Sequence, residues 1–398
     1  MEDYKKYFPI YANHKDLAYL DSAASSLKPK CVIDKIDYYY NNICVNVNRG
    51  VYSLSYEATD LYEESRRVVA KFINAKEEEI VFTRGASASL NLVANSYMDF
   101  INPGDEIITT LQEHHSSFMP WLNVCNKKGA KLVYIPLTED GKVTIENFKK
   151  VLTKNTKVVA INQVSNVLGY TNPIKEICKL AHEVGAIVSV DGAQSVPHMK
   201  VDVKDLDCDF LSFSGHKMCG PSGVGVLYGK YNLLQKMPPV EFGGDMAQDV
   251  YEHEMTFKDA PYKFETGTPL ISEVIALKDA IDFISNIGLD NIKARELELK
   301  KYALDKLKSV DGIEIYNNNL DSSLITFNIK GVHPHDAASI FDKNNVCIRA
   351  GFHCAQPITR FLDQISTIRC SFYFYNDFSD VDKFVKSVIE ARDFFLSF

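Results

Sequence analysis

Seven short apolar runs alternate with helical segments between about residue 65 and residue 230, and this alternation restricts the fold more than any other feature. Helical segments such as 173–184 repeat their apolar residues at helical spacing. Continuous apolar strands that alternate with helices indicate a mostly parallel sheet covered on both faces, whose ligands bind at the carboxyl ends of the strands. The expected strands are 79–82, 106–110, 131–136, 158–163, 187–191, 209–213 and 224–228.

After residue 270 the pattern changes to long helices around few strands. Helices are expected at 272–287, 291–310, 335–343 and from about 379, with a strand at 324–329. This α+β pattern predicts a smaller C-terminal domain, and the arm before Tyr19 is expected to pack with it. The predicted domains are a large one at 20–270 and a small one formed by 1–19 and 271–398.

Composition excludes several classes of protein. The chain has 398 residues, 46% of them apolar and 24% charged, so it can bury the cores of two domains. A net charge of −8 argues against nucleic-acid or membrane partners. No apolar run approaches the length of a membrane span, and the N-terminus lacks the apolar core of a signal peptide. Nine scattered cysteines without a CxxC pair are typical of reduced thiols in a cytoplasmic chain, and no metal site is expected.

The most informative segment is 214–217, Ser-Gly-His-Lys, which places Lys217 just after the strand at 209–213. Asp191 ends the strand at 187–191, so both groups are expected at the ligand-binding edge. Pyridoxal 5′-phosphate (PLP) needs an amine that bonds its aldehyde and a carboxylate that keeps its pyridine nitrogen protonated. Lys217 alone would more often be a solvated loop lysine, but together with Asp191 it indicates a PLP enzyme.

Three other strand ends carry polar residues that suit such a cofactor. Segment 83–89 opens a helix whose N–H groups suit a phosphate, although Ser87 or Ser89 would also serve as an ordinary helix cap. His114 could stack on a flat ring and move protons; the alternative is a solvent-exposed histidine pair, and metal binding is disfavoured because no further ligands follow. Asn166 could bond a cofactor hydroxyl or be a simple turn residue.

Cys354 lies in a loop bounded by Gly351 and Pro357, which predicts a mobile and exposed thiol. Arg349 and His353 are expected to favour its thiolate, the nucleophilic form. The alternative is a buried apolar cysteine, the default for this residue type, against which the polar and glycine neighbours argue. The other cysteines are assigned to packing, except Cys219, whose role is left open.

Arg369 lies in an expected strand near the final helix. An inward-facing arginine is costly unless it meets an anion. A substrate carboxylate bound bidentately would satisfy it, and an internal salt bridge would do so equally well.

These motifs, with Ala-Tyr-Leu-Asp-Ser-Ala-Ala at 18–24, resemble the SufS-type cysteine desulfurases, PLP enzymes of the aminotransferase class V superfamily. The resemblance runs nearly end to end. It implies the type I PLP-dependent aminotransferase fold, an α/β fold with a mostly parallel sheet in a large domain plus a smaller α+β C-terminal domain that carries the catalytic cysteine loop. It also implies a homodimer, because 267–269 resembles the segment that reaches the phosphate of the neighbouring subunit. Its most specific pieces are 164–169, 190–194, 214–217 and 349–357.

The resemblance implies a role for each site residue. The ring of PLP would be held at its aldehyde, nitrogen and phenolic oxygen by Lys217, Asp191 and Gln194 respectively. His114 would stack on it. The phosphate would be bound by Ser87, Ser214, His216 and, from the neighbouring subunit, Thr268. Binding of the substrate L-cysteine is assigned to Asn166, Arg369 and Arg349. The catalytic residues would be Lys217, Cys354 and His114, with Cys354 taking the sulfur.

Three positions depart from the family pattern. Asn48 and Phe352 stand where histidine is common, and Ala88 stands where an acidic residue is common. Family roles at these positions, including proton handling beside the thiol, are therefore not assigned.

The segment 332–336, Val-His-Pro-His-Asp, resembles the branch of the family that works with a zinc-containing SufU-type acceptor rather than a SufE-type one. In that branch a histidine matching His335 replaces a cysteine on the partner's zinc and frees that thiol for sulfur transfer. Neutral imidazole is a good zinc ligand. The alternative is a surface histidine pair beside Asp336, a helix cap.

The implied activity is conversion of L-cysteine to L-alanine, with a persulfide on Cys354 that supplies sulfur for iron–sulfur cluster assembly. A selenocysteine lyase or a class V aminotransferase would share the scaffold, although a transaminase has no use for a mobile cysteine loop. A catalytically silent scaffold is the non-enzyme alternative, against which intact Lys217, Asp191 and Cys354 argue.

Overall fold

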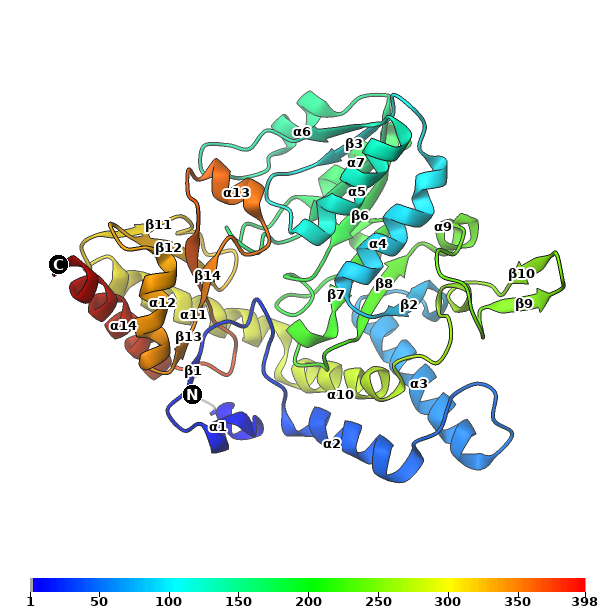
Figure 1. Cartoon of the computed structure of the whole chain (residues 1–398), viewed down its shortest axis with the longest axis horizontal. Coiled ribbons are helices and arrows are strands. Elements are labelled where there is room, and N and C mark those ends of the chain that lie inside the picture. Colours follow the sequence, from blue (N-terminus) through cyan, green and yellow to red (C-terminus); the bar gives the residue numbers. More distant parts are fainter. Residues whose placement is uncertain (1–2, 398) are drawn as a thin grey trace.

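The computed structural model describes residues 3–397, which form a large and a small domain (Figure 1). A seven-stranded sheet in the order β2-β8-β7-β6-β5-β3-β4 forms the large domain. Strands β4, β3, β5, β6 and β7 are parallel, while β8 runs antiparallel to both of its neighbours. The predicted mostly parallel sheet is confirmed, and each strand lies within two residues of its expected bounds: β2 (Ile80–Thr83), β3 (Glu106–Thr109), β4 (Lys131–Tyr134), β5 (Thr156–Asn162), β6 (Ile187–Asp191), β7 (Phe210–Ser214) and β8 (Gly225–Gly229).

Helices cover both faces of this sheet, and that is why its strands are apolar at successive positions. Ile107 faces one core and its neighbour Ile108 faces the other. The first face packs on α4 (Ala86–Tyr97) and α5 (His115–Lys128). Against the second lie α3 (Ser53–Phe72), α7 (Ile174–Glu183) and α10 (Ile271–Ile287). The other large-domain helices are α2 (Lys30–Tyr38), α6 (Ile145–Val151), α8 (Val203–Leu206) and α9 (Tyr231–Lys236).

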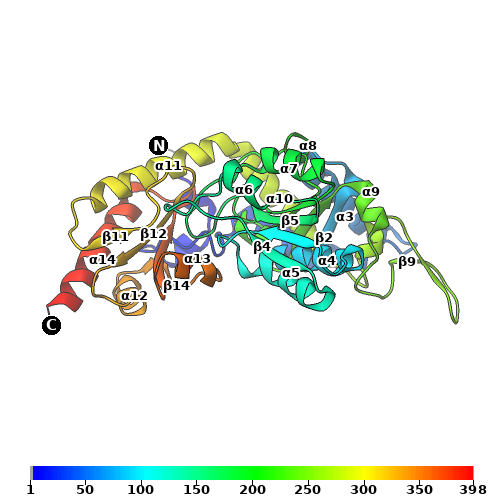
Figure 2. The ribbon, with the colours of Figure 1, turned by 90° about the horizontal axis from the view of Figure 1, so that it is seen from above.

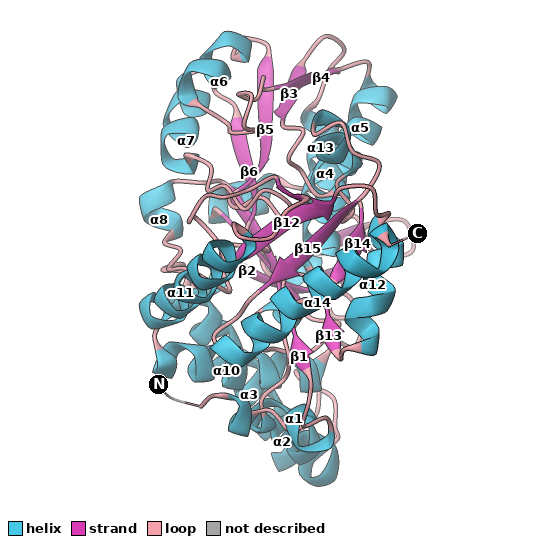
Figure 3. Ribbon diagram, turned by 90° about the vertical axis from the view of Figure 1, so that its left-hand side faces the viewer, coloured by secondary structure: helices cyan, strands magenta, loops and turns pink. Residues whose placement is uncertain are grey.

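The small domain is an antiparallel sheet in the order β11-β12-β15-β14, packed with helices (Figure 3). Residues from the N-terminal arm enter its core, because β1 (Ala18–Tyr19) pairs with β13 (Val346–Cys347). The sheet strands are β11 (Ile313–Ile315), β12 (Leu324–Ile329), β14 (Arg349–Gly351) and β15 (Thr367–Ser371). The main helices are α11 (Leu289–Leu307), α12 (Pro334–Lys343) and α14 (Phe378–Leu396).

Helix α10 belongs to the large-domain core, where its apolar residues pack with those of α2 and α3. Burial of these residues away from the small-domain sheet argues against a boundary at 270/271. We therefore propose Gly288, which separates α10 from α11, as the domain boundary.

Two short helices, α1 (Ile10–Asn13) and α13 (Gln356–Phe361), complete the fold, and β9 (Ala247–Val250) and β10 (Met255–Phe257) form a hairpin that projects from one end of the molecule (Figure 2). Helices of membrane-spanning length and hydropathy are absent from residues 3–397.

The assignment of the remaining cysteines to packing is wrong for Cys31 and Cys44, which are exposed on the surface. Cys219 is buried, and its inaccessible thiol favours a packing role.

Candidate active site

A cavity of about 260 Å³ lies where the carboxyl ends of β5, β6 and β7 meet the small domain. It contains every residue assigned to the site within one chain, from both domains. The predicted residues that line it are Ser87, His114, Asn166, Asp191, Gln194, Ser214, His216, Lys217, Arg349, Cys354 and Arg369.

Asp191 and Lys217 lie on neighbouring elements at the floor of this cavity. Asp191 ends β6, and its Oδ1 accepts the Ala193 N–H at 2.9 Å. Burial raises the pKa of Asp191, while the Ala193 N–H and the Lys217 amine oppose that shift. Lys217 ends the 3₁₀ turn η5 (Gly215–Lys217), and burial lowers the pKa of its amine to about 8, although Asp191 favours the charged form. Part of this amine is therefore neutral, and nucleophilic, near physiological pH.

The N-terminal arm fixes the peptide bond that precedes Lys217. The carbonyl of His216 accepts hydrogen bonds from the Ser26 N–H at 2.9 Å, Lys28 Nζ at 2.9 Å and Ser26 Oγ at 3.1 Å. His216 itself is kept neutral, because burial and then Lys217 lower its pKa to about 4. Gln194 is tied to the same arm, since its Nε2 donates to the Ala23 carbonyl at 2.7 Å.

The start of α4 forms the end of the cavity that suits a phosphate. Gly85 precedes the helix with φ of 140°, and a Cβ on Gly225 would lie only 2.3 Å from the Gly85 backbone. The Ala86 N–H donates to Ser214 Oγ at 2.8 Å, whereas the next N–H groups have no intrahelical acceptor. The N-cap residue of α4 is Gly85, which has no side chain to cap the helix, so the helix-cap alternative for Ser87 does not hold. Free N–H groups at a helix start favour an anion.

His114 caps α5 with its ring and faces the cavity. Its Nδ1 accepts the Ser116 N–H at 3.2 Å. Burial, and then the positive charge of Lys217, lower the pKa of His114 to about 3. The ring is therefore neutral with its proton on Nε2, a form that suits stacking on a flat cofactor and makes a poor base.

Two arginines meet at the small-domain wall around Asp21. Arg369 is 2% exposed; its Nη1 donates to the Asn166 carbonyl at 2.8 Å, and its Nη2 lies 3.4 Å from Asp21. Arg349 bonds Asp21 through both Nε and Nη2, the latter at 2.9 Å. The salt-bridge alternative raised for Arg369 thus holds only in part, because its contact with Asp21 is long. Sequence reasoning missed Asp21, although it closes an apolar run just as Asp191 does.

The cysteine loop (351–357) is docked on the large domain. Cys354 is exposed at the cavity, as predicted, and the buried alternative is excluded. Asn166 Nδ2 donates to the His353 carbonyl at 2.9 Å, and the His115 N–H donates to the Cys354 carbonyl at 2.7 Å. The expectation that His353 supports the thiolate as a cation is wrong, because burial holds its pKa well below the usual range; its Nε2 pairs with Thr367 Oγ1.

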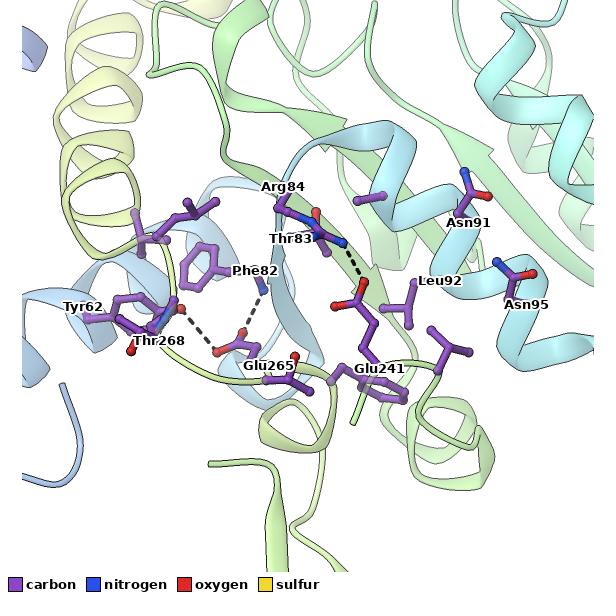
Figure 4. A pocket seen from close by; sticks show the side chains of 17 residues that line it. Tyr62, Phe82, Thr83, Arg84, Asn91, Leu92, Asn95, Glu241, Glu265 and Thr268 are labelled. Carbon is purple, nitrogen blue, oxygen red and sulfur yellow. Dashed lines mark hydrogen bonds and ion pairs between the residues drawn. The ribbon is translucent and has the colours of Figure 1, made fainter. Parts of the chain in front are cut away.

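Two assigned residues lie outside this cavity. Thr268 lines a separate cavity of about 320 Å³ together with Arg84 and Glu265 (Figure 4). His335 is exposed in the first turn of α12. The cap of that helix is His333, whose Nδ1 accepts the His335 N–H, so the capping role expected for Asp336 is wrong.

Unsatisfied buried atoms test whether a cofactor fits. Three buried atoms on residues that line the cavity have no hydrogen-bond partner within residues 3–397: Asn166 Oδ1, His353 Nδ1 and Arg369 Nε. Such atoms are rare in folded proteins and indicate a polar ligand. A lysine of lowered pKa, a strand-end carboxylate and a helix start with free N–H groups are the features that PLP requires. The fold and the cavity therefore define a PLP-dependent enzyme of the type I fold.

Comparison with known proteins narrows this class. The profile of the aminotransferase class-V family matches residues 18–384. A probable cysteine desulfurase of Halalkalibacterium halodurans is 50% identical over 396 residues, which cover 98% of each chain. Among solved structures, a cysteine desulfurase from Thermococcus onnurineus is 40% identical with a TM-score of 0.94 and 98% of each chain covered. The cysteine desulfurase CsdA from Escherichia coli is 37% identical with a TM-score of 0.92, covering 98% of this chain and 97% of that one. The chain belongs to the cysteine desulfurases of the aminotransferase class-V family.

Proposed function

We propose that the chain converts L-cysteine to L-alanine and that Cys354 accepts the sulfur as a persulfide. The observation that carries this proposal is that the Cys354 thiol and the Lys217 amine line one cavity, although they come from different domains. A transaminase or a silent scaffold has no need of a thiol there, whereas a desulfurase needs a second nucleophile beside the substrate.

The residues around the cavity divide the work of binding and proton transfer. PLP, when bound, supplies an electron-poor ring that stabilises negative charge at the substrate Cα. Asp191 would keep a proton on the ring nitrogen, and His114 would stack on the ring. Arg369 and Asn166 bind the substrate carboxylate. The Lys217 amine removes the proton from Cα and later returns protons to the carbon skeleton.

Sulfur transfer requires the Cys354 thiolate to attack the sulfur of the substrate. A new S–S bond forms while the bond between substrate sulfur and Cβ breaks, and the electron pair of that bond stays with Cβ. A proton added to Cβ completes L-alanine, so one thiol and L-cysteine become one persulfide and L-alanine. Arg349 lines the same cavity as Cys354 and is its cationic neighbour, whereas burial keeps His353 neutral.

Measurement of both products with L-cysteine tests this assignment. The variant Cys354→Ala is expected to retain the absorbance of bound PLP and to form no persulfide. Cys31→Ala, which removes another exposed thiol, is the matched control and should behave as the unmodified protein. Unchanged turnover of Cys354→Ala with an acceptor would refute the role of Cys354.

We further propose that a zinc-containing SufU-type protein takes the sulfur for iron–sulfur cluster assembly, with His335 as the residue that exchanges onto its zinc. In support, His335 is exposed, and α12 packs against β14, which leads directly into the cysteine loop. His335→Ala should lower turnover stimulated by such an acceptor and leave acceptor-free alanine release unchanged. The exposed His14→Ala is the control. Equal stimulation of both variants would contradict the exchange.

The functional form is proposed to be a homodimer in which Thr268 reaches the phosphate in the other subunit. Its position outside the cavity of its own chain supports this arrangement. Co-expression of Lys217→Ala with Thr268→Ala chains gives mixed dimers in which one site combines Lys217 with an intact Thr268 from its neighbour. One tight PLP site per mixed dimer is expected, and only weak PLP binding in those dimers would place Thr268 at its own site.

A further inference from the structure

His115 makes two hydrogen bonds to the cysteine loop, both to main-chain atoms that follow the Cα of Cys354. It is the first residue of α5, and its N–H donates to the Cys354 carbonyl at 2.7 Å. Its ring Nε2 accepts the Gln356 N–H at 3.3 Å. The ring also lies beside Phe352 and Phe118, with centroid distances of 6.4 and 5.9 Å. His115 is thus, with Asn166, one of the large-domain residues that hydrogen-bond the main chain around the thiol.

The loop conformation depends on contacts of this kind. His353 and Cys354 are consecutive residues that both have φ of 52°. This left-handed conformation is unfavourable for residues other than glycine. Further along the chain, Ala355 and Ile358 pack in an apolar cluster with Leu168, which anchors α13 to the large domain. The main chain that follows the Cα of Cys354 is therefore held both by the apolar packing of Ala355 and by the hydrogen bonds of His115.

We propose that His115 is a positioning residue for sulfur transfer: its Nε2 holds the Gln356 main chain so that the Cys354 thiol faces the cavity, and release of this bond lets the thiol turn toward the acceptor. The inference rests on the proposed function of Cys354. The bond suits a latch because it is long and exposed, so its loss changes the docked population by only about three- to tenfold. Burial lowers the pKa of His115, which keeps Nε2 free to accept at neutral pH.

Two substitutions separate the hydrogen bond from ring packing. His115→Gln keeps an acceptor at similar reach and loses the ring, whereas His115→Phe keeps the ring beside Phe352 and loses the acceptor. Both retain the N–H that donates to Cys354. In single turnovers at saturating L-cysteine, His115→Phe should form the Cys354 persulfide about three- to tenfold more slowly with an unchanged half-saturation concentration. His115→Gln should stay within about twofold of the unmodified protein.

Hydrogen–deuterium exchange of the Gln356 amide reads the latch directly and without turnover. Faster exchange is expected in His115→Phe and near-native exchange in His115→Gln, with His115→Leu as a second acceptor-free variant should the first fold poorly. Equal persulfide rates and equal exchange in Phe and Gln variants, or a Gln variant as impaired as the Phe variant, would overturn the inference. If the unmodified protein forms no persulfide on Cys354, the proposed function fails, and the exchange experiment still decides whether His115 holds the loop.

Discussion

Replacing Arg369 with lysine tests how the substrate carboxylate is held. The guanidinium is 2% exposed and presents N–H donors in a fixed fork. One of its nitrogens, Nη1, is committed to the Asn166 carbonyl at 2.8 Å, Nη2 makes only a long contact with Asp21 at 3.4 Å, and Nε has no partner within residues 3–397. Nε and Nη2 are therefore the pair that a carboxylate would occupy. Lysine keeps the charge and loses the fork, so one charge-assisted hydrogen bond disappears.

A hydrogen bond to a charged group contributes about 1.5–3 kcal/mol, so Arg369→Lys should raise the half-saturation concentration for L-cysteine about 10- to 150-fold. Arg349→Lys is the matched control, because the Arg349 fork already bonds Asp21 and its side chain is 46% exposed. An exposed pair contributes up to about 1 kcal/mol, which limits that change to about fivefold. Alanine release against L-cysteine concentration, with PLP occupancy checked by absorbance, gives both values. A smaller effect for Arg369→Lys than for Arg349→Lys would refute the assignment.

Three further predictions concern the cofactor and the fold. Uptake of PLP by cofactor-free protein should accelerate as pH rises through about 8, because the Lys217 amine reacts only when neutral; a rate that is flat from pH 6 to 9 by absorbance would contradict the lowered pKa. Gly225→Ala should weaken PLP binding, since the new Cβ would meet the Gly85 backbone at 2.3 Å, and native affinity by titration would show that the loop can yield. Glu265→Ala should lower the free energy of unfolding in urea by about 3 kcal/mol, because the buried Arg66, whose side chain is 1% exposed, then keeps only one carboxylate, that of the less buried Glu63. A loss under about 1 kcal/mol would refute this.

The sheet could be predicted from sequence because its strands are buried on both faces and therefore carry an uninterrupted apolar signal. The order of the strands could not, since nothing local to Gly225–Gly229 distinguishes an antiparallel strand from a parallel one. The same limit applies to α10, whose apolar residues show that it is buried but not which domain buries it.

At the site, motifs located the residues but not their partners. Lys217 and Asp191 follow strands, and that position alone brings them to one edge of the sheet. The neutral state of His353 depends on burial by other elements, which its neighbours in sequence do not reveal. The roles of Asp21 and His115 depend on contacts with residues more than 200 positions away, beyond the reach of local patterns.

The meeting of Asp21 with Arg369 sets an order of events during synthesis. The two residues are separated by 348 positions, so at roughly 5–20 residues per second the ribosome adds Arg369 about 17 to 70 s after Asp21. The N-terminal arm must wait through that interval before its carboxylate meets Arg369. A nascent or prematurely terminated chain can carry Lys217 and Asp191 and still lack the wall that receives the substrate. Release of sulfur from L-cysteine therefore requires a chain that extends at least to Arg369.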